Sequence, residues 1–122
     1  MTEREFKART KILALNVIRL VNELPANGTS GVLGRQLVRS GTAVGANYRA
    51  ACRAKSARDM ILKLSFVEEE ADESLYWLEL LVESGSTSSF EAKPLSDEFL
   101  EILAMTVASI HTLRRQSPIP NR

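Results

Sequence analysis

The sequence contains one cysteine, Cys52, and one histidine, His111, and these are side chains that enzymes use as nucleophile and base. A Cys–His pair also needs a third residue that orients the imidazole, and no such Asp or Asn is evident here. Cys52 lies near the end of a helical pattern, beside its apolar face. We therefore predict that Cys52 is a small buried hydrophobic residue and that His111 is structural or solvated.

Carboxylates are the second group that could carry chemistry, because acidic clusters in helical bundles bind pairs of metal ions. Glu68, Glu69, Asp72 and Glu73 form such a cluster, but the sequence has no Glu-x-x-His pair to complete a di-metal site. It also lacks a Gly-rich phosphate loop, a Gly-x-Ser-x-Gly turn and a Cys-x-x-Cys motif. The sequence predicts a non-enzymatic protein with no catalytic residue, metal or cofactor. An enzyme that uses the acidic cluster is the least favoured interpretation.

A run of bases without acids is the clearest chemical signal in the chain. Between Glu23 and Asp59 there is no acid, and the bases are Arg35, Arg39, Arg49, Arg53, Lys55 and Arg58. On a helical wheel the four arginines lie within about 80° of one another, opposite the apolar face. Such a stripe could contact the phosphates of a nucleic acid. Alternatively, the arginines pair with the seven acids between residues 68 and 83, within or between subunits, and the two interpretations can coexist.

An apolar face on the segment 57–84 points away from its core seam. It consists of Leu62, Phe66, Trp77 and Leu80, within about 60° on the wheel, and is bordered by Glu69, Glu73 and Tyr76. Exposed apolar patches of this size mark contact surfaces, so we predict an oligomer interface. The alternative is that the first and last helices cover this face. We expect Glu69 and Glu73 to satisfy Asn47 or arginines at the packed centre.

These side chains fall on four helical patterns, predicted over residues 5–24, 30–53, 57–84 and 95–116. Turn formers at 25–29 precede Ser30, a predicted N-cap, and Ser56 with Asp59 fits a capping box. Residues 85–94 form the longest predicted linker, with Ser96 as the last N-cap. The third segment carries a core seam of Met60, Leu64, Val67, Ala71, Leu75, Leu78 and Val82. The pattern predicts an all-α, antiparallel up-and-down four-helix bundle, with a single domain over 1–116 and a flexible tail over 117–122.

Three glycines, Gly34, Gly41 and Gly45, fall inside the second predicted helix. Each lowers helix propensity by about 1 kcal/mol relative to alanine, so each should have a structural reason. Close approach of a neighbouring helix is the favoured reason, and a kink or local unwinding is the alternative.

Length and composition fit this fold. A chain of 122 residues with 44% hydrophobic and 25% charged residues forms one globular domain, and a net charge of +1 gives no strong global field. The first eleven residues include six charged ones and lack the apolar stretch of a signal peptide. No segment approaches the roughly 18 apolar residues of a membrane span. We expect a cytoplasmic protein without a membrane partner.

Two stretches resemble a known family. Residues 39–56 read RSGTAVGANYRAACRAKS, and residues 66–81 read FVEEEADESLYWLELL. They resemble the four-helix bundle proteins encoded by intervening sequences of bacterial 23S ribosomal RNA genes (S23-like), from Phe6 to Arg115. The most specific residues are Arg39, Ser40, Asn47, Ala50 and Ala51, together with Glu70, Glu73, Tyr76, Trp77 and Leu78. One departure is Arg49, since many relatives continue after the Asn with Ile-Ala-Glu-Gly, which makes this site more positive here.

The resemblance implies an up-and-down bundle that assembles as a ring-like homopentamer with no established enzyme activity. The chain is also similar to the accessory variability proteins of diversity-generating retroelements, basic pentameric bundles that bind nucleic acid and a reverse transcriptase. We therefore expect a homo-oligomeric scaffold whose ligand is structured RNA or another nucleic acid. The alternative is a protein-interaction adaptor in which the arginines form structural salt bridges and the Phe66 and Trp77 surface holds a protein partner.

Overall fold

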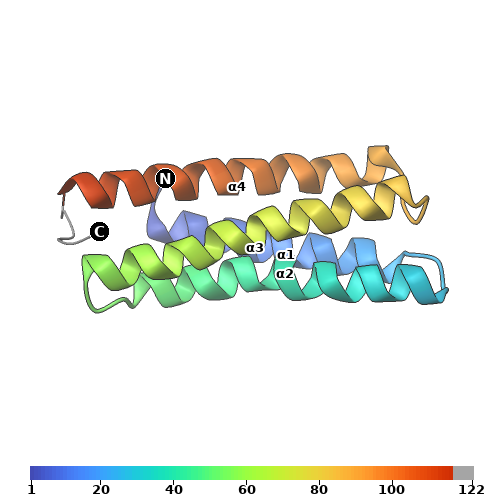
Figure 1. Cartoon of the computed structure of the whole chain (residues 1–122), viewed down its shortest axis with the longest axis horizontal. Helices are drawn as coiled ribbons and strands as arrows, with labels where there is room; N and C mark the ends of the chain where they lie inside the picture. Colours follow the sequence, from blue (N-terminus) through green and yellow to red (C-terminus); the bar gives the residue numbers. More distant parts are fainter. Residues whose placement is uncertain (117–122) are drawn as a thin grey trace.

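The computed structural model, which describes residues 1–116, contains four α-helices joined by short connections (Figure 1). They are α1 (Glu3–Asn22), α2 (Gly28–Cys52), α3 (Ala57–Glu83) and α4 (Ser89–Gln116). Successive helices run in opposite directions, which confirms the predicted all-α up-and-down bundle. The predicted flexible tail at 117–122 lies outside the described residues.

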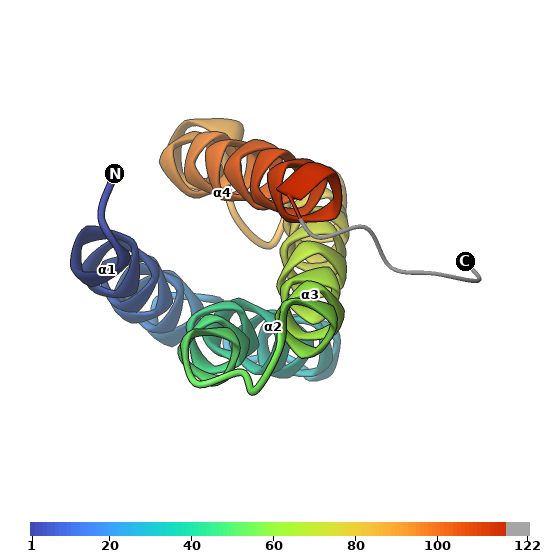
Figure 2. The same cartoon turned by 90° about the vertical axis from the view of Figure 1, so that its left-hand side faces the viewer.

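Each helix packs on the next one along the chain, and a smaller contact between α1 and α4 closes the bundle. Seen from one end, the helices form an arc in which α1 and α3 lie diagonally opposite each other (Figure 2). The α1–α4 side is therefore the loosest seam, while α2 and α3 share the most extensive contact.

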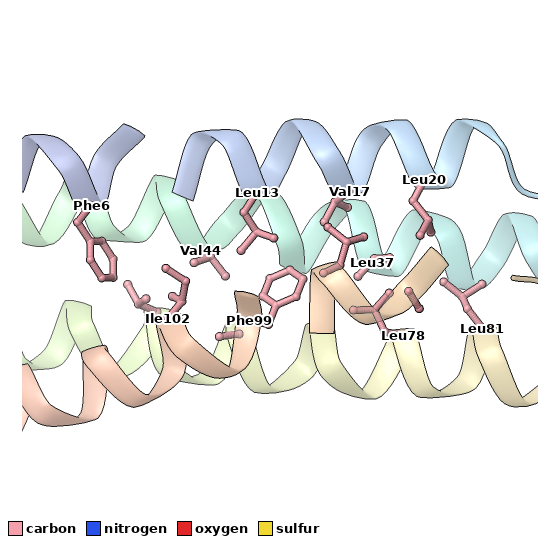
Figure 3. Packing of buried hydrophobic residues seen from close by; sticks show 14 residues of the cluster. Phe6, Leu13, Val17, Leu20, Leu37, Val44, Leu78, Leu81, Phe99 and Ile102 are labelled. Atoms are coloured by element: carbon pink, nitrogen blue, oxygen red, sulfur yellow. The ribbon is translucent and has the colours of Figure 1, made fainter. Parts of the chain in front are cut away.

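The core runs along the inside of this arc. Figure 3 shows that all four helices contribute, with Phe6, Leu13, Val17 and Leu20 from α1, Leu37 and Val44 from α2, Leu78 and Leu81 from α3, and Phe99 and Ile102 from α4. A smaller cluster of Ala51, Ile61, Leu64 and Ile110 closes one end. On α3 the buried face is rotated toward α2 relative to the predicted seam. Ser74 and Leu81 are buried, whereas Leu75 and Val82 of the predicted seam are only partly buried. Ser74 faces α2, because it hydrogen-bonds Ser40 of that helix.

Two helix starts differ from the predictions. α2 begins at Gly28, because the side chain of Asn27 accepts the Ser30 N–H (2.9 Å) as N-cap, and Ser30 is buried inside the helix. α4 begins at Ser89, well before Ser96, and Ser88 accepts the Glu91 N–H (3.1 Å). The predicted linker over 85–94 is therefore wrong in its second half. Pro94 removes one helical hydrogen bond, but burial of Ala92 and Leu95 beside it offsets that loss.

The predicted cap of α3 and the predicted role of the glycines hold, except that the capping box at Ser56 is only half formed. Ser56 caps α3 by accepting the Asp59 N–H (3.0 Å), but the Asp59 carboxylate accepts the N–H of Lys55 (3.2 Å) in place of that of Ser56. α2 continues without a break through its glycines, so close approach is their role. A Cβ on Gly41 would lie 3.1 Å from a Val17 methyl group, and one on Gly45 would lie 3.2 Å from the Thr10 hydroxyl.

Candidate functional site

The six bases selected from the sequence are all exposed, and they lie along one strip of the molecule. Arg35, Arg39 and Arg49 belong to α2, Arg53 is the C-cap residue of that helix, Lys55 lies in the connection, and Arg58 lies in the first turn of α3. The strip thus extends past α2 and turns the corner into α3.

Arg39 differs from the other five because it is paired with acids of α3. Its guanidinium contacts the carboxylate of Glu70 (Nη1–Oε1, 3.4 Å) and forms an ion pair with Glu73. The interpretation that the stripe pairs with the α3 acids is therefore correct for Arg39. This arginine ties α2 to α3, and its charge is already neutralised.

The other five bases carry no such partner within residues 1–116. No carboxylate of this part of the chain lies within 4 Å of the side-chain nitrogens of Arg35, Arg49, Arg53, Lys55 or Arg58. Asp59, the acid nearest to them in sequence, is bound to the Lys63 ammonium (2.9 Å). That hydrogen bond and the one from the Lys55 N–H lower the pKa of Asp59. These five positive charges are available to a ligand.

A groove between α1 and α2 contains bases of α1 that were not among the six bases predicted from the sequence. It has a volume of about 440 Å³, and it is lined by small residues such as Gly45 and Ala46 and by Lys7, Lys11 and Arg49. Lys7 pairs with Glu3 (3.1 Å). The signal in the sequence is the spacing of Arg4, Lys7 and Lys11, which places three bases on one side of α1. A shallow groove with basic walls can admit a phosphate chain.

The apolar face of α3 is exposed in the single chain. Leu62 and Tyr76 are each 53% exposed and Phe66 is 40% exposed, while Trp77 and Leu80 are half-buried. The alternative that α1 and α4 cover this face is therefore wrong. The face has some internal order, since the Trp77 indole N–H donates to Glu73 (3.0 Å) and its ring packs on Tyr76.

The expectation for the two flanking acids is half right. Glu73 accepts from both Arg39 and Trp77, so it is satisfied at the α2–α3 seam. Glu69 is exposed, and it forms no hydrogen bond or ion pair with any residue between 1 and 116. Asn47 donates to the carbonyl of Ala43 (2.9 Å) within its own helix, so it does not bind either acid.

The residues that carry the family resemblance meet at the same seam. Ser40 and Ser74 share a hydrogen bond (2.7 Å) between α2 and α3, directly beside the contacts of Arg39 with Glu70 and Glu73. Both hydroxyls are fully buried. These residues thus hold α2 against α3, and they do not involve the five exposed bases that lack a carboxylate partner.

Cys52 and His111 show no catalytic arrangement. Burial raises the pKa of the half-buried Cys52 thiol, so at neutral pH it is protonated and a poor nucleophile. His111 is exposed. Across residues 1–116, no three His, Cys, Asp or Glu side chains gather closely enough to hold a metal ion. None of the four described helices is long and apolar enough to cross a membrane.

The chain is similar to one known protein family and to a solved structure. The model of a family described as 23S rRNA-intervening sequence protein matches residues 3–108. A crystal structure from Bacteroides thetaiotaomicron VPI-5482, described as a protein with unknown function from the S23 ribosomal protein family, superposes with a TM-score of 0.84. It is 31% identical and covers 91% of this chain and 99% of its own. A comparison with curated proteins found no match. Neither of the two matching descriptions names a reaction.

Proposed function

Since the chain belongs to the 23S rRNA-intervening sequence protein family, we propose that it is a non-enzymatic, homo-oligomeric scaffold that binds structured RNA through the basic surface of α2. The observation that carries this proposal is the set of five exposed bases without a carboxylate partner among residues 1–116. Unpaired arginines on a rigid helix neutralise phosphates and release counterions, which makes binding sensitive to salt. We place this activity in the cytoplasm, where structured RNA is available.

Two outward apolar faces support the oligomer. α3 carries the face of Leu62, Phe66 and Tyr76, and α1, which lies diagonally opposite α3 (Figure 2), exposes Ile12, Leu15 and Ile18. Two different faces on opposite sides favour head-to-tail contacts, which close into rings, over a two-fold dimer. A homopentameric ring is the form that the family resemblance implies.

The charges around these two faces are complementary. Lys11 and Arg19 flank the α1 face, and Glu69, which lacks a partner within its own described chain, flanks the α3 face. In a ring, the α1 face of one subunit would meet the α3 face of its neighbour and supply that partner. Opposite charges at the rim fix the register of such an interface more than its affinity.

RNA binding is tested by sedimentation of the protein with a labelled RNA hairpin at increasing salt. We expect binding that weakens steeply with salt, and its loss in the Arg49→Glu/Arg53→Glu variant. The Lys93→Glu variant reverses an exposed charge outside the stripe and outside both apolar faces, and it should retain most of the binding. A wild-type protein that ignores RNA at low salt would exclude the RNA-binding proposal.

The oligomer is tested by one matched pair of variants. Leu62 on α3 and Leu100 on α4 are each 53% exposed, so a change to glutamate costs each a similar amount of local burial. We expect Leu62→Glu to dissociate the assembly and Leu100→Glu to leave it intact, as measured by light scattering at micromolar concentration. A monomeric wild-type protein would contradict the proposal.

The protein-interaction adaptor is the second candidate, and the pairing of Arg39 with Glu70 and Glu73 favours it. Under this alternative the Phe66 and Trp77 surface holds another protein. It gains support if Leu62→Glu leaves the oligomeric state unchanged and the wild-type protein does not bind RNA.

A further inference from the structure

The near-zero net charge hides a separation of charge along the bundle. One end of the bundle comprises residues 1–8, 47–66 and 106–116, which meet through the rings of Phe6 and Tyr48 and the cluster of Ala51, Ile61, Leu64 and Ile110. This end holds the α2–α3 connection, and it has nine Lys and Arg against three Asp and Glu, a net of +6. The rest of residues 1–116 has six Lys and Arg against twelve Asp and Glu, a net of −6. Residues 1–116 therefore form a basic end and an acidic end.

All four helices contribute to the basic end. Figure 2 shows the start of α1, the α2–α3 connection and the end of α4 together at this end of the bundle. Packing holds them there, because Ala51, Ile61 and Ile110 share one apolar cluster and the rings of Phe6 and Tyr48 lie 4.3 Å apart. The exposed bases brought to this end are Arg4, Arg49, Arg53, Lys55, Arg58, Arg114 and Arg115.

The few acids of the basic end are largely occupied by local contacts. Glu5 accepts the N–H of Thr2 (3.1 Å) in the capping box of α1, and Glu3 pairs with Lys7. Asp59 is bound to Lys63. The positive charge of this end is thus turned outward, while its negative charge is held against the backbone and neighbouring lysines.

The acidic end has the opposite character, although part of the arginine stripe lies there. A groove between α1 and α4 is lined by Glu23, Glu91 and Asp97 together with Arg19 and Lys93, and Lys93 pairs with Asp97 (2.9 Å). Arg35 lies in this part of the bundle, exposed like Arg53, but it shares it with twelve acids. A phosphate chain that approached Arg35 would also meet the field of those acids.

The two ends are far enough apart to act separately. A 27-residue helix such as α3 is about 40 Å long at 1.5 Å per residue. The Debye length is about 8 Å at physiological salt, so the field of one end is screened at the other. A ligand with dense negative charge therefore encounters two independent surfaces, one attractive and one repulsive.

We propose that the phosphate backbone of a structured RNA docks on the basic end of the bundle, across the α2–α3 connection and the adjoining ends of α1 and α4, and not along the whole length of α2. This inference rests on the proposed RNA-binding function and deepens it. Four helix ends packed at 8–10 Å present a surface roughly 20 Å across, which faces several phosphates of a duplex at once. In a ring whose axis of cyclic symmetry runs along the bundles, all basic ends lie on the same side, and the RNA binds that side of the ring.

The experiment compares two double variants that each remove two exposed positive charges outside the proposed subunit interface. Arg53→Gln/Arg58→Gln lies at the basic end, and Arg35→Gln/Lys93→Gln lies at the acidic end. The probe is a fluorescently labelled RNA hairpin of mixed sequence, and its Kd is measured across a salt series. Circular dichroism and light scattering verify that both variants keep the helix content and assembly of the wild-type protein.

We expect the basic-end variant to raise Kd by about tenfold to a hundredfold near 0.1 M salt and to lower the slope of log K against log salt by about two. The acidic-end variant should change Kd by less than about threefold and leave the slope unchanged. Equal losses in both variants would overturn docking at one end while leaving RNA binding by the whole stripe in place.

Two further outcomes overturn the inference in other ways. A wild-type protein that does not bind the hairpin removes the proposed function itself, and the inference with it. A wild-type protein that binds with a steep salt dependence, but loses nothing in the basic-end variant, keeps the proposed function and places its site elsewhere on the molecule.

Discussion

The middle of α2 and its C-terminal end have similar compositions but different surroundings. In the middle, Gly41 and Ser40 lie against α1 and α3, and the guanidinium of Arg39 is held by Glu70 and Glu73. At the C-terminal end and in the following connection, Arg53 and Arg58 are exposed and have no carboxylate within 4 Å among residues 1–116. In the middle of α2, small and basic residues thus hold the helices together. At the C-terminal end, the basic residues remain exposed and unpaired within residues 1–116.

This difference shows that one helical stripe can carry two functions in succession. In the middle of α2, Arg39 holds two helices together, so a substitution there should change the stability of the fold. The end is held by a cap and a small apolar cluster, so its charges can be changed without loss of the fold. The predictions below test this separation, in order of decreasing effect.

Gly41→Leu should have the largest effect on stability. A Cβ at this position would lie 3.1 Å from Val17 and 3.5 Å from Phe99, and a leucine adds three more carbons to a site without space. We expect the free energy of unfolding to fall by about 3 kcal/mol or more, measured by urea denaturation. Gly31→Ala is the control, because its Cβ meets only the end of Arg35, and it should raise stability by up to about 1 kcal/mol. Similar effects at both positions would show that α1 and α2 are not closely packed.

Ser56→Ala should have an intermediate effect, confined to the end. The Ser56 hydroxyl accepts the N–H of Asp59 (3.0 Å) at the start of α3. Its loss should lower the free energy of unfolding by about 1 kcal/mol. Amide hydrogen exchange should accelerate in the first turn of α3 and remain slow near Val44 in the middle of α2. Uniform acceleration along both helices would contradict the separation of the two regions.

Arg39→Gln should have a smaller effect on stability and little effect on RNA binding. The arginine side chain is half exposed, so solvent screens its ion pairs and the expected loss is about 0.5 kcal/mol. Arg53→Gln is the matched control, with no change in stability and weaker binding of an RNA hairpin. The two variants should therefore exchange rank between urea denaturation and a binding titration. If Arg39→Gln weakens binding as much as Arg53→Gln, the middle of α2 also contacts RNA.

The smallest expected effect is a loss of stability at low pH through Asp59, at the start of α3. Hydrogen bonds from Lys63 and from the Lys55 N–H lower the pKa of Asp59 below its ordinary value of 3.8. A carboxyl group whose pKa is lowered on folding stabilises the protein above that value, and this stabilisation is lost as pH falls through the folded pKa. The urea midpoint should therefore decline below about pH 4, with a flatter decline in Asp59→Asn. Identical profiles in the two proteins would exclude this contribution.

Much of the fold was predictable because its signals are local. Amphipathic periodicity is enough to place four helices, and the cap at Ser56 depends on residues only three positions apart. The start of α4 was not predictable in the same way, since Pro94 and the polar residues before it are typical of a loop. Burial of Ala92 and Leu95 against the other helices keeps that segment helical, and this is a tertiary effect.

The candidate site was predictable in its residue types and not in their pairing. The run without acids between Glu23 and Asp59 identifies the bases. It does not distinguish Arg39 from Arg53, because pairing with Glu73 depends on how α2 and α3 are rotated and at what level they cross. Lys11 was missed for a related reason, since it becomes part of the groove with Arg49 only when α1 packs beside α2.

The sequence by itself determined the four helices, the capping of α3, the bases between Glu23 and Asp59, and the apolar face of α3. Only the tertiary structure decided which arginine is neutralised and that bases from all four helices gather at one end. Periodicity and capping act within a few residues, whereas the meeting of Arg4, Arg53 and Arg114 joins positions about 50 or more residues apart. Their gathering follows from antiparallel packing, which brings distant helix ends together.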